Sequence, residues 1–196
     1  EAGEKSAYYK AAMSGNDKDA DGNLIPGDAK FVKELGGIDQ DLNEMCPYIY
    51  EKAYSPHLAA QIEGNPVNLD YVVEKLRGLE KKYDYITLEG SGGILCPLRF
   101  DDEEIYLEDF VKKAKLSSII VADAGLGTIN NLVLTAFYMK EKGMKVKGII
   151  FNNFIPGDVL QEDNIKMCQH MSGLKVLACV KKGDKDLDIC LLYTSD

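Results

Sequence analysis

Residues 118–152 read SIIVADAGLGTINNLVLTAFYMKEKGMKVKGIIFN, and this stretch decides the fold. An apolar, β-branched run from Ser118 to Asp123 is followed by a glycine-containing loop, a segment of helical periodicity from Ile129 to Lys142, and a second apolar run from Val146 to Phe151. Strand, helix and strand in this order predict a βαβ unit with two parallel strands. Nearly continuous isoleucine and valine in both runs predicts strands that are buried on both faces.

The same alternation of short apolar runs and helical segments extends in both directions along the chain. Further strands are expected at 6–10, 85–88 and 175–180, and further helices at 28–35, 68–83, 107–115 and 159–171. This order is typical of an α/β fold with three layers, in which helices cover a mostly parallel sheet. At 196 residues the chain has the length of one domain with its own core.

Local signals mark the ends of two of these helices. Asn68 supplies cap chemistry for the helix that carries the apolar stripe Val72, Leu76, Leu79 and Tyr83. The helix after the glycine loop has the stripe Leu132, Ala136 and Met139, and Gly143 is expected to end it in a left-handed conformation. The two stripes are expected to pack on the sheet.

Composition and charge exclude several classes of partner. The chain has 23 basic and 32 acidic residues, a net charge of -9, so nucleic acid is not an expected partner. No apolar run approaches the roughly 20 residues of a membrane helix, and Glu1 to Lys5 lacks the pattern of a secretory signal, so no membrane partner is expected. The 5 cysteines never form a C-x-x-C motif and are expected to be buried thiols in the reducing cytoplasm.

The residues that follow the first two strands carry chemical groups. Ligands of parallel sheets bind beyond the carboxyl ends of the strands. The first strand leads into Lys10 and Ser14, and the second leads into Glu89 and a glycine-rich turn with Gly92 and Gly93. Backbone amides without side chains can approach an anion closely in such a turn.

The next two strands end in similar positions. The strand that ends at Asp123 continues into a glycine loop and a helix that bears Asn130, and the amides at a helix N-terminus favour negative charge. The strand that follows ends at Asn152, whose amide offers both a donor and an acceptor to a polar ring edge.

Each of these residues also has a purely structural interpretation. Lys10 is equally consistent with a solvent-facing lysine at a strand end, and Asp28 is, on local grounds, better explained as a helix N-cap than as a metal ligand. The glycine loop fits a simple strand-to-helix turn, and Asn152 fits the start of a turn. Glu89 favours function, because a structural turn needs no carboxylate there.

Several motifs occur together in one order. They are Tyr9-Lys10 with Ser14-Gly15, then Ser55-Pro56-His57, then Glu89-Gly90-Ser91-Gly92-Gly93, then GLGTIN at 125–130, and then the segment from Gly148 to Asn152. Together they resemble the dethiobiotin synthetases, ATP-dependent enzymes of biotin synthesis, and the resemblance covers Ala7 to about Val180. The sequence departs from the family pattern at Ala11, Ser91 and Asn131, where proline, alanine and histidine are usual.

The resemblance implies a P-loop NTPase fold whose first strand, phosphate-binding loop and first helix are missing from the printed sequence. No G-x-x-x-x-G-K-S/T motif occurs in it, and the family has that loop immediately upstream of the segment that matches Glu1. Residues 1–189 are therefore expected to be a partial domain that is inactive by itself. The tail from Cys190 to Asp196 can be encoded by DNA that resembles a transposase end used in sequencing libraries, and we expect it to be an artefact.

The resemblance also implies a reaction and a site. The family uses ATP and Mg²⁺ to join 7,8-diaminononanoate and CO₂ through a carbamate and a carbamic-phosphoric anhydride, and it forms homodimers. The resemblance implies that Lys10 is the catalytic cation between carbamate and γ-phosphate and that Asp28 and Glu89 are Mg²⁺ ligands. It implies that Ser14 supports phosphate or substrate and that the amides of Gly92 and Gly93 position the diamine or its carboxylate. Asn130 would reach the substrate tail across the dimer interface, and Asn152 would pair with the adenine edge.

Two alternatives remain open at this stage. Another P-loop relative, such as a cobyrinate amidotransferase-type synthetase or a partition-type ATPase, would share the sheet and the nucleotide, although the G-T-I-N loop disfavours it. A non-catalytic module that dimerises through the helix of Asn130 belongs to a different class. A glycine-rich lysine loop in the reading frame upstream of Glu1 would favour the enzyme.

Overall fold

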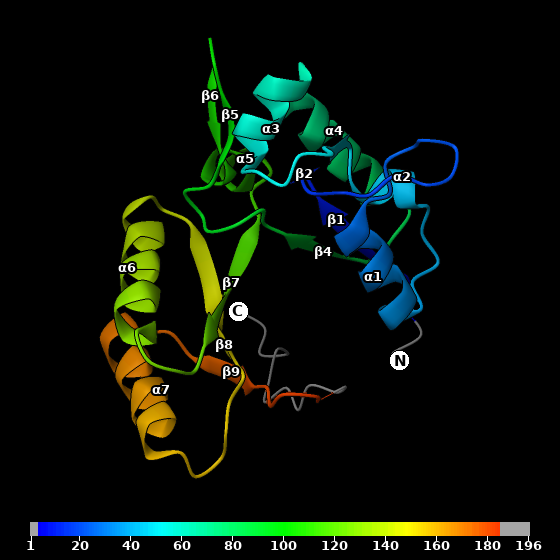
Figure 1. Ribbon diagram of the computed structural model, residues 1–196. Helices are drawn as coiled ribbons and strands as arrows, with labels where there is room; N and C mark the ends of the chain where they lie inside the picture. Colours follow the sequence, from blue (N-terminus) through cyan, green and yellow to red (C-terminus); the bar gives the residue numbers. More distant parts are fainter. Residues whose placement is uncertain (1–3, 185–196) are drawn as a thin grey trace. The chain divides into compact units, whose positions relative to one another are not determined.

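The computed structural model describes residues 4–184, and the chain divides into two compact units, Glu1–Ala114 and Lys115–Asp196. Each unit is an α/β structure whose strands pair mostly in parallel (Figure 1). The tail from Cys190 to Asp196 lies outside the described residues.

The first unit is built around two pairs of parallel strands. Strand β1 (Ser6–Lys10) pairs in register with β4 (Tyr85–Glu89), and β2 (Ala12–Met13) pairs with β3 (Tyr48–Ile49). Strands β5 (Pro97–Phe100) and β6 (Glu104–Tyr106) form an antiparallel hairpin. The helices of this unit are α1 (Gly27–Gly36), α2 (Leu42–Met45), α3 (Pro56–Glu63), α4 (Leu69–Leu79) and α5 (Leu107–Lys113).

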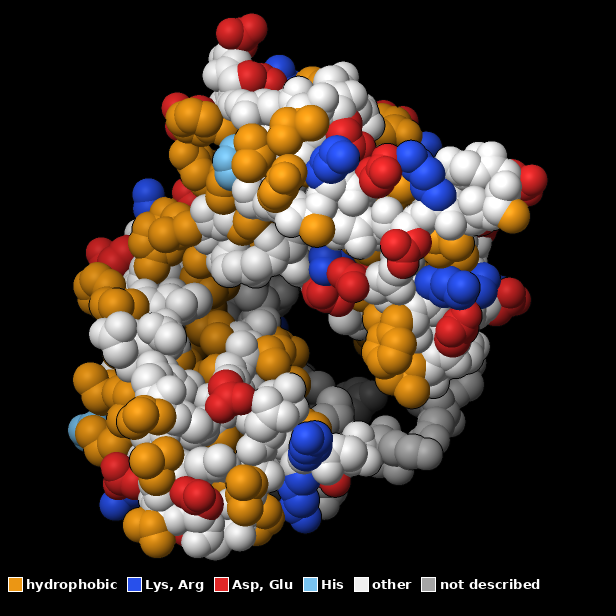
Figure 2. Space-filling model, in the orientation of Figure 1, with side chains coloured by type: hydrophobic (Ala, Val, Ile, Leu, Met, Phe, Trp, Pro, Cys, Tyr) orange, Lys and Arg blue, Asp and Glu red, His pale blue; other side chains and the backbone are white. Residues whose placement is uncertain are grey.

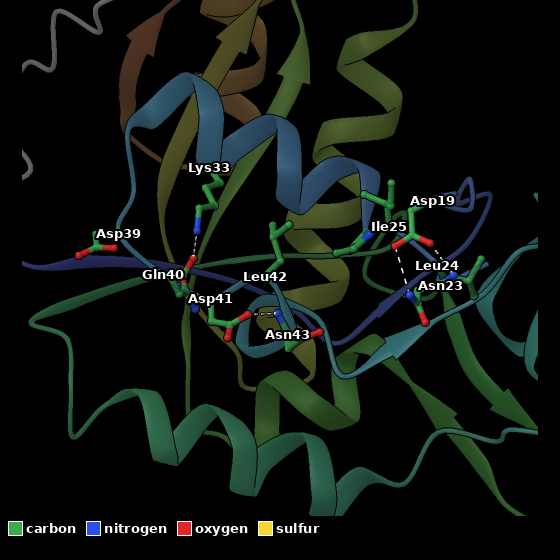
Figure 3. A pocket seen from close by; sticks show the side chains of 11 residues that line it. Asp19, Asn23, Leu24, Ile25, Lys33, Asp39, Gln40, Asp41, Leu42 and Asn43 are labelled. Carbon is green, nitrogen blue, oxygen red and sulfur yellow. Dashed lines mark hydrogen bonds between the residues drawn. The ribbon is translucent and has the colours of Figure 1, made fainter. Parts of the chain in front are cut away.

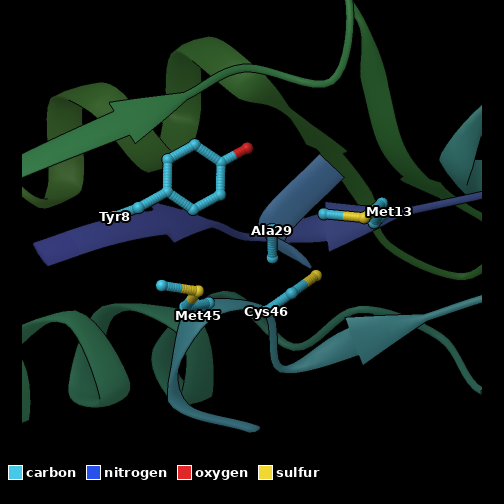
Figure 4. Close-up of a cluster of buried hydrophobic side chains, with 5 residues drawn as sticks. All are labelled: Tyr8, Met13, Ala29, Met45 and Cys46. Carbon is cyan, nitrogen blue, oxygen red and sulfur yellow. The ribbon is translucent and has the colours of Figure 1, made fainter. Parts of the chain in front are cut away.

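Strand β1 has apolar packing on both faces because successive side chains of a strand alternate in direction. Tyr8 belongs to a buried cluster formed by β1, β2, α1, α2 and the residue after α2, with the members Tyr8, Met13, Ala29, Met45 and Cys46 (Figure 4). Tyr9 points the other way: its ring lies 6.1 Å from that of Phe110, and its hydroxyl donates to the Val72 carbonyl of α4.

The second unit contains the predicted βαβ arrangement. Its sheet has the order β7 (Ser117–Asp123), β8 (Lys145–Asn152) and β9 (Val176–Cys179), with both pairs parallel. Helices α6 (Thr128–Glu141) and α7 (Val159–Ser172) pack side by side next to this sheet (Figure 1).

Most expectations for the helices are confirmed. The stripe on α6 is buried, Gly143 follows the helix with a φ of 70°, and Asn68 caps α4 by accepting from the Tyr71 amide. Helix α4 ends at Leu79 and not at Tyr83; beyond it the chain turns, and the amides of Lys82 and Tyr83 both donate to the Leu79 carbonyl.

The structure corrects one expectation about the strands. Burial on both faces fits the middle of β8, where Ile149 and Phe151 are fully buried on one face and, on the other, Gly148 is buried and Ile150 is partly buried. It is wrong for β7, where Ile119 is 41% and Val121 is 65% exposed. Ile119 and Val121 lie on one face of β7 and Ile120, which is 9% exposed, lies on the other, so only one face of this strand is covered. Within residues 4–184, no helix combines the length and the hydropathy needed to cross a bilayer.

Candidate active site

A buried lysine stands between two carboxylates at the carboxyl end of β1. Lys10 pairs with Glu89 in the register of β1 and β4, and its Nζ lies 2.7 Å from Glu89 Oε1 and 2.7 Å from Asp28 Oδ2. The Lys10 side chain is 8% exposed, whereas those of Asp28 and Glu89 are 55% and 47% exposed. Lys10 is therefore not a solvent-facing lysine, and both carboxylates keep an open side.

The charge of Lys10 is maintained by this arrangement. Burial alone would lower the pKa of Lys10, but the hydrogen bonds to Asp28 and Glu89 and their negative charges outweigh burial, so the pKa is raised above its ordinary value. An ammonium group that is partly desolvated and permanently charged is suited to stabilising an anion.

Asp28 reaches Lys10 from the first turn of α1 and does not cap that helix. The N-cap is Pro26, which makes no side-chain capping bond, so the N-cap interpretation of Asp28 is wrong. The buried side chain of Asn16 fixes this turn: its Nδ2 donates to the carbonyls of Met13 and Tyr50, at 3.0 and 2.9 Å, and its Oδ1 accepts from the Gly27 amide at 3.0 Å.

Glu89 has a second partner that sequence analysis did not single out. The Tyr8 hydroxyl donates to Glu89 Oε2 at 2.7 Å, while Glu89 Oε1 is bound by Lys10. Burial raises the pKa of Tyr8, and the hydrogen bond to Glu89 and its charge raise it further. The phenol therefore remains a proton donor to this carboxylate.

The other predicted residues of the first unit lie in turns. The Ser14 hydroxyl donates to the Tyr54 carbonyl at 2.5 Å. Gly92 has a φ of 112°, and a Cβ there would lie 3.3 Å from Cys96 Sγ. Nothing lies within 4 Å of a Cβ built at Gly93. The backbone of the turn thus requires glycine at 92, whereas position 93 has room for a side chain.

Asn130 and Asn152 belong to the second unit. Asn130 is exposed near the start of α6, and Asn152 ends β8, where its carbonyl accepts from the Ala124 amide at 2.9 Å. Neighbouring groups fix the strand ends: Asp123 accepts from Asn153 Nδ2 and from the Gly125 amide, both at 2.7 Å. These hydrogen bonds lower the pKa of Asp123.

A surface hollow of about 780 Å³ lies beside α1. Its lining comes from the loop before α1, from Lys33 and from residues 39–43, and it includes none of the predicted site residues (Figure 3). Asp19 binds Asn23, the Asp41 carboxylate accepts from the Asn43 amide, and Lys33 binds the Gln40 carbonyl. These groups bind one another, whereas Gln40 Nε2 of the same lining is buried without a hydrogen-bond partner.

The carboxylates of Asp28 and Glu89 fit one kind of metal ion. In the described part of the chain, no three His, Cys, Asp or Glu side chains are grouped to hold a metal by themselves. Mg²⁺ does not need such a cage, because it is commonly held by one or two carboxylates together with waters and substrate phosphates. Two half-exposed carboxylates that share one lysine match that donor set.

Solved structures show the class of the fold. The MinC:MinD cell division protein complex of Aquifex aeolicus aligns with a TM-score of 0.52 and 10% identity, covering 93% of this chain and 71% of that one. A ParA family ATPase from Chlorobium tepidum aligns with a TM-score of 0.50 and 15% identity, covering 92% and 71%. The fold is therefore that of the P-loop NTPase class of α/β proteins.

Sequence relatives narrow this class to a family. Residues 1–185 match the family described as AAA domain. The ATP-dependent dethiobiotin synthetase BioD of Brachyspira hyodysenteriae is 45% identical over 182 residues, which are 92% of this chain and 80% of that protein. The enzyme of the same name from Clostridium acetobutylicum is 46% identical over 177 residues, 90% of this chain and 73% of that protein. The chain belongs to the dethiobiotin synthetase family, ATP-dependent ligases of biotin synthesis.

Proposed function

We propose that this protein joins 7,8-diaminononanoate and CO₂ into the cyclic urea of dethiobiotin, using ATP and Mg²⁺. One observation carries the proposal: the Lys10 ammonium is buried and lies 2.7 Å from both Asp28 and Glu89. A reaction that brings a carbamate to a triphosphate accumulates negative charge, and a preorganised cation is the group that such a transition state needs.

The proposed reaction has three steps. An amine nitrogen of the substrate attacks the carbon of CO₂, and loss of a proton leaves a carbamate. A carbamate oxygen then attacks the γ-phosphorus of ATP, and the bond from that phosphorus to the bridging oxygen breaks to release ADP. The second amine attacks the carbamate carbon and loses a proton, the bond from that carbon to the phosphate oxygen breaks to release inorganic phosphate, and the ring closes. Lys10 is placed in this proposal between the carbamate and the γ-phosphate, where it stabilises the charge of both.

The two carboxylates are proposed to hold the cation that accompanies the nucleotide. Bound Mg²⁺ would neutralise charge on the transferring phosphate. Lys10 engages one oxygen each of Asp28 and Glu89, and Tyr8 donates to the other oxygen of Glu89. Each carboxylate oxygen can accept more than one bond, so both side chains keep lone pairs for a metal ion. The proposed metal role is therefore supported by the carboxylate oxygens of these two side chains.

The remaining roles follow from which groups are still free to bind. Because the Ser14 hydroxyl already donates its proton to Tyr54, its oxygen is left to accept, which favours contact with a substrate amine over contact with phosphate. The turn at Gly92 and Gly93 is proposed to position the substrate through its amides. Asn130 is proposed to reach the substrate tail, and Asn152 the adenine edge.

A homodimer and a cytoplasmic location complete the proposal. Leu126, Leu134 and Phe137 are 90%, 59% and 62% exposed and share one side of α6 and its preceding loop with Asn130. Hydrophobic side chains along the outer side of α6 are visible in Figure 2. An apolar stripe of this kind supports pairing of two α6 helices. The described cysteines are free thiols, which supports a reducing compartment.

The reaction can be tested by following its carbon. The full-length gene product, incubated with ATP, Mg²⁺, 7,8-diaminononanoate and ¹³C-bicarbonate, is expected to form dethiobiotin whose ureido carbon carries the label in mass spectrometry. Omitting either the diamine or bicarbonate is expected to stop both product formation and ADP release. ADP release that continues without the diamine would contradict the proposal and indicate an ATPase of the partition type.

A further inference from the structure

The ring and the hydroxyl of Tyr8 lie in two different environments. Its ring is 3% exposed and packs in the cluster with Met13, Ala29, Met45 and Cys46, and phenylalanine would satisfy that packing equally well. Figure 4 shows its hydroxyl directed away from Met45 and Cys46. That hydroxyl donates to Glu89 Oε2 at 2.7 Å. The core packing therefore requires only the ring of Tyr8, whereas its hydroxyl has Glu89 as its partner.

The geometry of β1 explains how the Tyr8 hydroxyl reaches Glu89. Tyr8 and Lys10 are two positions apart on β1, so their side chains lie on the same face, and Lys10 stands opposite Glu89 in the register. A step of two residues along a strand is about 6.6 Å, a span that a tyrosine side chain can bridge. The two oxygens of Glu89 thus receive different donors, Lys10 on Oε1 and Tyr8 on Oε2.

We propose that Tyr8 is a positioning residue that holds the Glu89 carboxylate in the orientation from which it binds the nucleotide-associated divalent cation. The Glu89 side chain is 47% exposed, and without a second fixed donor its carboxylate could rotate about its terminal torsion while keeping the contact with Lys10. The inference rests on the proposed role of Glu89 as a metal ligand. Hydrogen bonds to the outer atoms of ligands commonly tune metal affinity in this way.

The test is Tyr8→Phe, which removes one hydroxyl and keeps the ring. Binding of Mn²⁺ to the complex of the full-length protein with ADP is measured by electron paramagnetic resonance of the free ion, a readout independent of turnover. Tyr8→Phe is expected to weaken Mn²⁺ binding by about tenfold, as is typical when a metal ligand loses its hydrogen-bonding partner. The Mg²⁺ concentration needed for half-maximal turnover should rise by a similar factor, with kcat at saturating Mg²⁺ changed by less than about twofold.

Tyr9→Phe is the matched control. Tyr9 is the next residue on β1, is fully buried, and donates its hydroxyl to the Val72 carbonyl on the other face, so this variant loses an equally buried tyrosine hydrogen bond away from the site. It should leave Mn²⁺ binding unchanged. Equal loss in both variants would show a general structural effect and would overturn the proposal.

Glu89→Gln separates this inference from the proposal on which it depends. Weakened Mn²⁺ binding in Glu89→Gln and in Tyr8→Phe supports both. Weakened binding in Glu89→Gln with unchanged binding in Tyr8→Phe would overturn the positioning role alone. Unchanged binding in Glu89→Gln would instead remove the metal role of Glu89.

Discussion

Lys10 shows how burial and charge compete at one residue. Burial disfavours the ammonium, but Asp28 and Glu89 restore it, with the net result that the pKa of Lys10 is raised above the ordinary value of 10.5. Because the folded pKa is the higher one, the stabilisation that this charge provides is fully present below about pH 10 and is lost only as pH rises through the folded pKa. At neutral pH the lysine is therefore available as a cation.

Gly92 and Gly93 differ in what their backbones permit, and this difference predicts unequal responses to the same substitution. Gly92→Ala is expected to lower the free energy of unfolding by about 1–3 kcal/mol, because alanine is strained at positive φ. At Gly93 the φ is ordinary and the space is open, so Gly93→Ala should change the free energy of unfolding by less than about 0.5 kcal/mol. Urea denaturation of the two variants provides the comparison. Similar stabilities would show that the turn tolerates a side chain at either position.

At the scale of elements, parallel pairing determines which residues meet. The in-register pairing of β1 and β4 places Lys10 and Glu89 at the same edge, which sequence alone could anticipate from the strand ends. Asp28 arrives by a different route, because Asn16 ties the first turn of α1 to the ends of β2 and β3. A single asparagine in a polar loop gives no motif that would reveal this function.

The exposed apolar stripe of helix α6 leads to a prediction about the homodimer. If its exposed stripe is the dimer interface, Leu134→Asp should convert the dimer into a monomer, because a buried unpaired carboxylate is costly. Leu160→Asp introduces the same change at a 46% exposed leucine of α7 and should leave the dimer intact. Sedimentation velocity at micromolar concentration distinguishes the two. Dimers that persist in Leu134→Asp would place the interface elsewhere.

Within residues 4–184, segments with an apolar run or a helical period were predictable, and most short segments without one were not. The βαβ arrangement of β7, α6 and β8 follows from apolar runs and helical periodicity, and it is confirmed. Six shorter elements were missed, namely β2, β3, α2, α3, β5 and β6, which have 2–8 residues each. Most of these elements carry too few positions for a period to stand out. The similarly short strands β1, β4 and β9 were predictable because they lie in apolar runs.

The candidate site follows the same rule. Charged residues at strand ends, such as Lys10 and Glu89, stand out against apolar neighbours. Tyr8 does not stand out, because an aromatic residue inside a strand is typical of a core position. Only the structure shows that its hydroxyl binds Glu89. The structure excludes the N-cap interpretation of Asp28, since the cap is Pro26 and the hydrogen-bond partner of Asp28 is Lys10. Its metal role stays a proposal.

The buried cation Lys10 is proposed to act on the transferring phosphate. The most direct test is the kcat of the full-length Lys10→Met variant, which keeps the length of the side chain and removes its charge, with Lys18→Met, at the exposed ion pair with Glu51, as control. Lys10→Met is expected to lower kcat by roughly 10² to 10³-fold while thermal unfolding shows a folded protein, and Lys18→Met is expected to stay near the unmodified rate. A folded Lys10→Met protein that makes dethiobiotin within about threefold of that rate would contradict this role of Lys10.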